Sequence, residues 1–120
     1  SRQRRSPASA GADAAGGATA AVDRKAQKRA EAEARQRSYA QRKPLADRLA
    51  RIEREIDGLS AEKRAAEATL AAPEIYAEGN RDRLQETLAR QGDLAWRLAR
   101  LETEWLEVSE ALEELATDSP

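Results

Sequence analysis

Leucine and isoleucine recur at alternating steps of four and three residues through the middle of the chain. The stripe occupies positions 45, 49, 52, 56, 59, 63, 66 and 70, and only Lys63 and Ala66 in it are neither Leu nor Ile. This is the heptad spacing of a helix that buries one narrow seam. Pro44 stands just before the stripe, where a missing backbone N–H costs a helix nothing. The pattern therefore predicts a helix that begins at Pro44.

The stripe stops at the sequence LAAPEIYAEGN, residues 70–80. Pro73 cannot continue a helix, and Gly79 frees the backbone. Asn80 is suited to cap a new helix by accepting hydrogen bonds from its first-turn N–H groups. We therefore expect a turn at about 73–80 and a second helix from about 81 to 115.

A second heptad stripe runs along this second helix. We assign to it Leu84, Leu88, Gln91, Ala95, Leu98, Leu101, Trp105, Val108, Leu112 and Leu115. The steps change register between Leu98 and Leu101, which predicts a local irregularity there or near Gly92.

Two helices joined by so short a connection pack antiparallel if they pack at all. Facing residues then have numbers that add up to about 154, which pairs Leu70 with Leu84 and Lys63 with Gln91. Apolar residues meet in nearly every layer, and the two polar positions of the stripes, Lys63 and Gln91, meet each other. The fold class is therefore all-α: an antiparallel coiled-coil hairpin over 44–116 in a monomer. The alternative is two separate helices that each pair with another copy of the chain.

The composition permits only a thin core. Leu, Ile and Val total 17 of 120 residues, and all but Val22 follow residue 44. No apolar run approaches the length that crosses a membrane. The chain opens with Ser1-Arg2 instead of Met, so we expect it to be a piece of a longer protein.

Charge divides the chain into two halves of opposite sign. Residues 1–43 carry a net charge of +7, and residues 44–120 carry −8.

Within the basic half, Ser, Ala and Gly dominate 1–23, which we expect to be a flexible linker. Residues 24–43 are helix formers without an apolar stripe, so we expect a partly helical basic segment. Residues 117–120 form a short tail. Side by side, the basic start and acidic end of the hairpin can attract each other.

Catalytic chemistry is not indicated. The chain has no His and no Cys, and no GxxxxGK[ST] phosphate loop occurs. The many carboxylates fall on solvated helix faces, where they are neither tuned acids nor a metal cage. We therefore exclude catalytic residues, a metal site and a bound cofactor for this chain.

Basic residues near the open end of the hairpin are the candidate binding site. Cations along a helix can neutralise nucleic-acid phosphates with little sequence preference, and a tyrosine can stack on a base. The candidates are Lys25, Lys28, Arg29, Arg35, Arg37, Tyr39, Arg42, Lys43, Arg48 and Arg51. The alternative is a solubilising linker whose cations pair in part with Glu31 and Glu33.

Three stretches carry a resemblance to a known family. They are Ser38-Tyr39 followed by a charged run, the tip LAAPEIY at 70–76, and Trp105-Leu106-Glu107. Over about residues 36–115 the chain resembles the C-terminal coiled-coil domain of Uup-like ABC-F ATPases.

The resemblance implies a role in a larger cytoplasmic protein. The parent would bind ATP and Mg²⁺ and hydrolyse ATP in domains absent here, and this end domain would be a non-catalytic DNA-binding domain for branched DNA. The wider family acts at the ribosome, which implies an alternative in which the hairpin docks on ribosomal RNA or protein. The docking residues would then be Pro73, Glu74, Ile75 and Tyr76 at the tip. A third possibility is a structural spacer that positions the ATPase domains. The acidity of the hairpin departs from a DNA-binding rod, which limits DNA contacts to the basic segment and the Arg48–Arg54 face.

Overall fold

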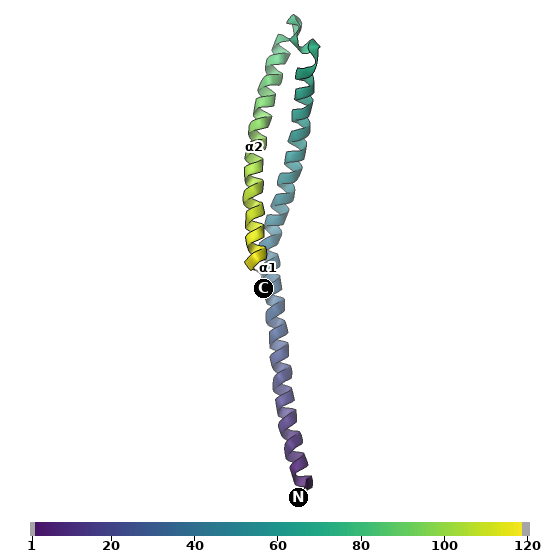
Figure 1. Ribbon diagram of the computed structural model, residues 1–120, viewed down its shortest axis with the longest axis vertical. Coiled ribbons are helices and arrows are strands. Elements are labelled where there is room, and N and C mark those ends of the chain that lie inside the picture. Colours follow the sequence, from purple (N-terminus) through teal and green to yellow (C-terminus); the bar gives the residue numbers. More distant parts are fainter. Residues whose placement is uncertain (1, 119–120) are drawn as a thin grey trace. The chain divides into compact units, whose positions relative to one another are not determined.

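The fold is a set of helices joined by one tight turn. The computed structural model describes the backbone of residues 2–118 and the side chains of residues 17–118. Its elements are α1 (Arg2–Ala71), two short 3₁₀ turns, η1 (Pro73–Tyr76) and η2 (Glu78–Asn80), and α2 (Arg81–Asp118) (Figure 1). No strand occurs among residues 2–118, so the all-α prediction is confirmed. The chain divides into two units, Ser1–Ala40 and Gln41–Pro120, which are described separately below.

The start of α1 differs from the sequence prediction. We expected a flexible linker over 1–23 and a helix beginning at Pro44, whereas α1 begins at Arg2 and contains Pro44. Alanine, the best helix former, is frequent before residue 35, which favours helix there. At Pro44 one backbone hydrogen bond is lost, but strong helix formers flank it on both sides. At the other end, α2 extends to Asp118, and the rest of the predicted tail lies outside the described residues.

The second unit is the predicted antiparallel hairpin (Figure 1). Three contacts connect α1 and α2 along it. Arg90 Nη2 lies 3.0 Å from Glu62 Oε1, Trp105 Nε1 donates to Glu53 Oε1 at 3.1 Å, and Arg48 Nη2 lies 3.9 Å from Glu104 Oε2. Glu62, late in α1, contacts the first part of α2, whereas Arg48 and Glu53, earlier in α1, contact its later part, so the helices run in opposite directions. The contact at Arg48 is also the predicted attraction between the basic start and the acidic end.

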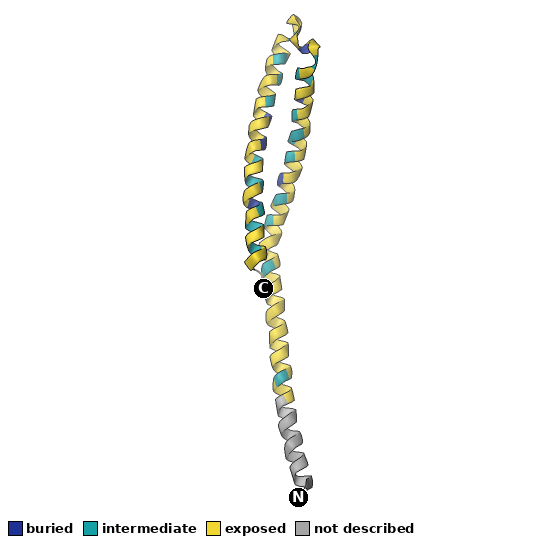
Figure 2. Cartoon of the chain, viewed as in Figure 1, coloured by how far each residue is buried: buried dark blue, intermediate teal, exposed yellow. Residues whose placement is uncertain are grey.

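A narrow apolar seam joins the two helices, and the least exposed residues of each helix face the other (Figure 2). On α1 all eight predicted stripe positions are buried or half-buried, with Ile52 and Ala66 the most enclosed. On α2 the most enclosed residues are Leu94, Leu98 and Val108. The heptad prediction for α1 is therefore confirmed at every position.

Two positions of the α2 stripe were predicted wrongly. Leu88 is 50% exposed and Ala95 is exposed, whereas Thr87 is half-buried and Leu94 is only 3% exposed. With Thr87 and Leu94 in the stripe, the steps from Leu84 to Leu115 alternate between three and four without a break. The predicted change of register therefore disappears, and α2 is one uninterrupted helix.

The turn lies where the sequence predicted it, and it is closed by its own side chains. Tyr76 Oη donates to the Leu70 carbonyl at 2.6 Å, and Asn80 Nδ2 donates to the Glu74 carbonyl at 2.7 Å. Among the described residues, Asn80 is thus a donor to the turn and not the predicted acceptor cap of α2. Ile75 is 2% exposed and anchors the turn between the helix ends. These contacts hold the tip of the hairpin in one conformation.

Candidate nucleic-acid interface

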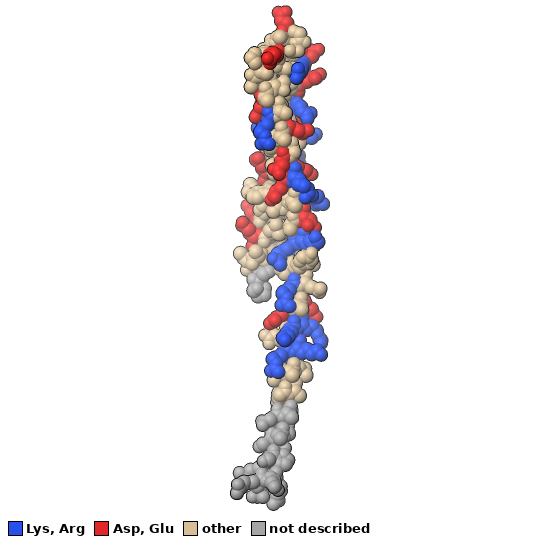
Figure 3. Space-filling model, turned by 90° about the vertical axis from the view of Figure 1, so that its right-hand side faces the viewer, with Lys and Arg blue, Asp and Glu red and all other residues tan. Residues whose placement is uncertain are grey.

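The basic segment of the first unit presents its cations on a helical surface. Residues four and seven apart share one face of an α-helix, so Lys28, Arg35 and Tyr39 lie along one face, flanked by Lys25 and Arg29. All five side chains are exposed. In the space-filling view, Lys and Arg side chains gather on the described part of this unit (Figure 3). These five residues therefore form one cationic surface that includes an aromatic ring, whereas Arg37, nine residues after Lys28, is exposed on the opposite side of the helix.

Sequence reasoning missed one member of this surface, Arg24. It lies four residues before Lys28 on the same helix and is exposed. The helical spacing alone could have identified it, because Arg24, Lys28 and Arg35 are four and seven residues apart.

The predicted cations of the first unit form no ion pair with any residue that the structure describes. They are Lys25, Lys28, Arg29, Arg35 and Arg37. Glu31 and Glu33 are exposed on the same helix, yet neither pairs with them. The internal pairing expected for a solubilising linker is thus not seen among the described side chains. Tyr39, Arg29 and Arg35 also line a shallow groove of about 470 Å³.

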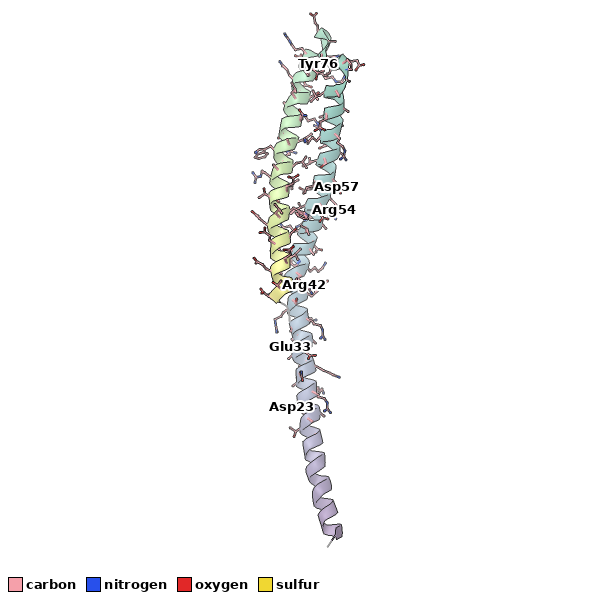
Figure 4. The ribbon with its side chains drawn as sticks, in the orientation of Figure 1. Asp23, Glu33, Arg42, Arg54, Asp57 and Tyr76 are labelled. Carbon is pink, nitrogen blue, oxygen red and sulfur yellow. The ribbon has the colours of Figure 1, made fainter. Side chains whose placement is uncertain are left out.

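The predicted cations of the second unit have more internal partners. Lys43 Nζ lies 3.2 Å from Asp47 Oδ2, and Arg48 pairs with Glu104. Arg42, which is labelled in Figure 4, also takes part in an interaction within the chain. Arg51 is exposed and makes no ion pair with any described residue. Neutralised cations contribute less to phosphate binding, so the first unit holds the greater part of the available positive charge.

The four predicted docking residues at the tip do not form one accessible surface. Pro73, Glu74 and Tyr76 are exposed, and Tyr76 marks the end of the hairpin (Figure 4). Ile75 is buried, so its side chain supports the turn and is not available to a partner in this conformation.

Neither a metal site nor a membrane segment appears in the described part of the chain. Residues 17–118 contain no group of three or more acidic, His or Cys side chains arranged to hold a metal ion. Within the same residues, no helix is both long enough and apolar enough to span a bilayer.

Comparison with known proteins identifies one family. Residues 36–110 match the family model described as ABC transporter C-terminal domain. The match covers nearly the whole hairpin and agrees with the resemblance found at 36–115. Neither the curated proteins nor the solved structures gave a match to this chain.

Proposed function

The chain belongs to the family of C-terminal domains of ABC transporter-type ATPases, of the Uup-like kind, and from this premise we propose that it is a non-catalytic DNA-binding domain. The basic segment contacts DNA phosphates, and the ATPase domains of the parent protein supply the chemistry. The observation that carries this proposal is the set of exposed cations at Lys25, Lys28, Arg29, Arg35 and Arg37, which form no ion pair with any described residue.

Phosphate binding fits these residues better than binding to a protein surface. Each exposed cation that meets a phosphate releases condensed counterions, which favours binding. These cations have no ion pair with a described residue that would have to break first. Tyr39, on the same helix face, adds a ring on which an unpaired base can stack. The C-terminal part of α2, from Leu101 onward, carries seven acids and no base and repels phosphate, so binding concentrates on the cationic segment.

Salt-dependent binding of the whole chain to DNA tests the proposal. A variant with Lys25, Lys28, Arg29, Arg35 and Arg37 all changed to Gln should lose binding near physiological salt. For the parent, log K should fall with log salt by roughly 0.9 per phosphate contacted, so five contacts give a slope of about −4 to −5.

A matched control removes charge from the part of the hairpin around its turn. Changing Arg64, Arg81 and Arg83 to Gln should leave DNA binding largely intact, whereas changing Lys25, Lys28 and Arg35 to Gln should weaken it. Equal losses in the two variants would show that only net charge matters and would overturn the assignment of the site. A parent chain with no affinity for DNA or RNA would instead support a spacer, and tighter binding to structured RNA would support ribosome docking.

A further inference from the structure

A groove on one flank of the hairpin takes no part in the cationic surface. It has a volume of about 560 Å³ and lies between α1 and α2. Gly58, Leu59 and Leu101 give it an apolar lining, and Trp96 and Arg100 contribute from α2. Sequence reasoning missed this place because Trp96 falls outside the heptad stripe.

Trp96 is unusually accessible for so large an apolar side chain. It is 60% exposed, and Arg100 Cζ lies 5.1 Å from the centroid of its ring. This is a cation–π contact, which favours a stacked arrangement of the guanidinium on the indole. The indole and the guanidinium both have planar surfaces, and both stack with nucleic-acid bases.

Gly58 keeps the α1 side of the groove flat. A Cβ atom at this position would meet nothing within 4 Å, so the packing of the hairpin does not require a glycine there. Glycine in a helix interior is less stable than alanine. The lack of a side chain at Gly58 leaves the α1 side of the groove open.

Most of the charges around the groove are already paired. Glu62 pairs with Arg90 at 3.0 Å, Glu104 with Arg48 at 3.9 Å, and Arg97 with Asp93 at 3.2 Å. Glu55 also lines the groove, and it makes no ion pair with any described residue. The groove is thus suited to an uncharged planar ligand that can donate a hydrogen bond to one carboxylate.

We propose that this groove binds one unpaired nucleobase, which lies against the Trp96–Arg100 pair and donates its exocyclic amino group to Glu55. The inference rests on the proposed function, because it assumes that DNA reaches the hairpin. Cytosine N4 is a known donor to glutamate, whereas thymine has no exocyclic amino group. Bases inside a duplex are stacked and paired, so the groove selects unpaired strands, as they occur at the junctions of branched DNA.

The fluorescence of Trp96 tests this inference directly. The Trp105→Phe variant leaves Trp96 as the sole tryptophan and can be titrated with short deoxycytidine strands, thymidine strands and duplex DNA. We expect deoxycytidine strands to quench Trp96 most strongly and duplex least. In the parent chain, Trp96→Ala should lower affinity for deoxycytidine strands by roughly tenfold and leave duplex affinity unchanged.

Matched variants test whether the quenching of Trp96 and the preference for deoxycytidine depend on the residues that line the groove. Gly58→Leu should fill the groove and abolish quenching, whereas Gly92→Leu, on α2 outside the groove, should not. Glu55→Ala should remove the preference for deoxycytidine over thymidine. Asp57→Ala, in the same stretch of α1 but outside this groove (Figure 4), should retain that preference.

Two outcomes would overturn the inference. Unchanged Trp96 fluorescence while the chain still binds DNA would exclude a base in this groove and leave the proposed function intact. Quenching by a lysine-rich peptide but not by any single strand would assign the groove to a basic protein segment. Failure of the proposed function is distinct, since then the chain would bind neither duplex nor single strands.

Discussion

Replacing Leu94 by Ala is expected to destabilise the hairpin much more than the same change at Leu88. The two leucines lie six residues apart in α2, so helix propensity changes equally in both variants. Leu94 is 3% exposed and Leu88 is 50% exposed. At about 0.8 kcal/mol per buried methylene, Leu94→Ala should cost about 2–3 kcal/mol. Leu88→Ala should cost about 1 kcal/mol, because half of its side chain is already in water.

Urea unfolding followed by far-UV circular dichroism measures both costs. The difference of about 1.5 kcal/mol should also appear as a gap of roughly 6–12 °C between the melting temperatures of the two variants. Equal costs, or a larger cost at Leu88, would refute this account. Such a result would mean that α2 packs through Leu88 and Ala95, as the sequence alone predicted.

Three further substitutions follow from the contacts of the hairpin. Gly92→Ala should stabilise it by about 1 kcal/mol in the same urea experiment, since the added Cβ meets nothing within 4 Å and alanine favours helix. Ser109→Ala should stabilise it by about 0.5–1 kcal/mol, because the enclosed Ser109 Oγ has no hydrogen-bond partner among the described residues; destabilisation would reveal a partner. Tyr76→Phe removes the donor to the Leu70 carbonyl and should cost about 0.5–1 kcal/mol, with faster hydrogen exchange confined to the turn. Exchange at the turn as slow as in the parent would show that this bond contributes nothing.

The sequence predicted the hairpin because its α1 stripe and its turn residues act locally. Leu and Ile at heptad spacing could face only one seam, and Pro73 had to end the helix. In α2 the residue pattern did not decide whether the buried stripe runs through Leu88 and Ala95 or through Thr87 and Leu94. A stripe through Leu88 is as apolar as one through Thr87, and only the partner helix decides which one is enclosed. An exposed leucine is common on protein surfaces, so residue type alone could not exclude Leu88 from the seam.

The candidate sites were predictable to different degrees. The basic segment follows from residue type, but its lack of ion pairs with Glu31 and Glu33 depends on side-chain positions that a sequence does not contain. Ile75 was assigned to a docking surface because it lies in a turn, and its burial follows from the way η1 folds between the helix ends. The groove at Trp96 and Gly58 joins residues from two helices, so no local pattern could reveal it.

Lys63 and Gln91 are the half-buried polar residues at corresponding positions of the two stripes, and they favour one lengthwise alignment of the helices. Lys63 is half-buried in the seam, and its ammonium group reaches Glu67 at 3.4 Å. If α2 slid by one heptad along α1, Lys63 would lie opposite Leu84 or Leu98, and Gln91 opposite Ile56 or Leu70. Either shift would place polar side chains beside aliphatic ones, which disfavours it. The two polar residues thus weaken the seam at one layer and favour one alignment of the hairpin over alignments displaced by a heptad.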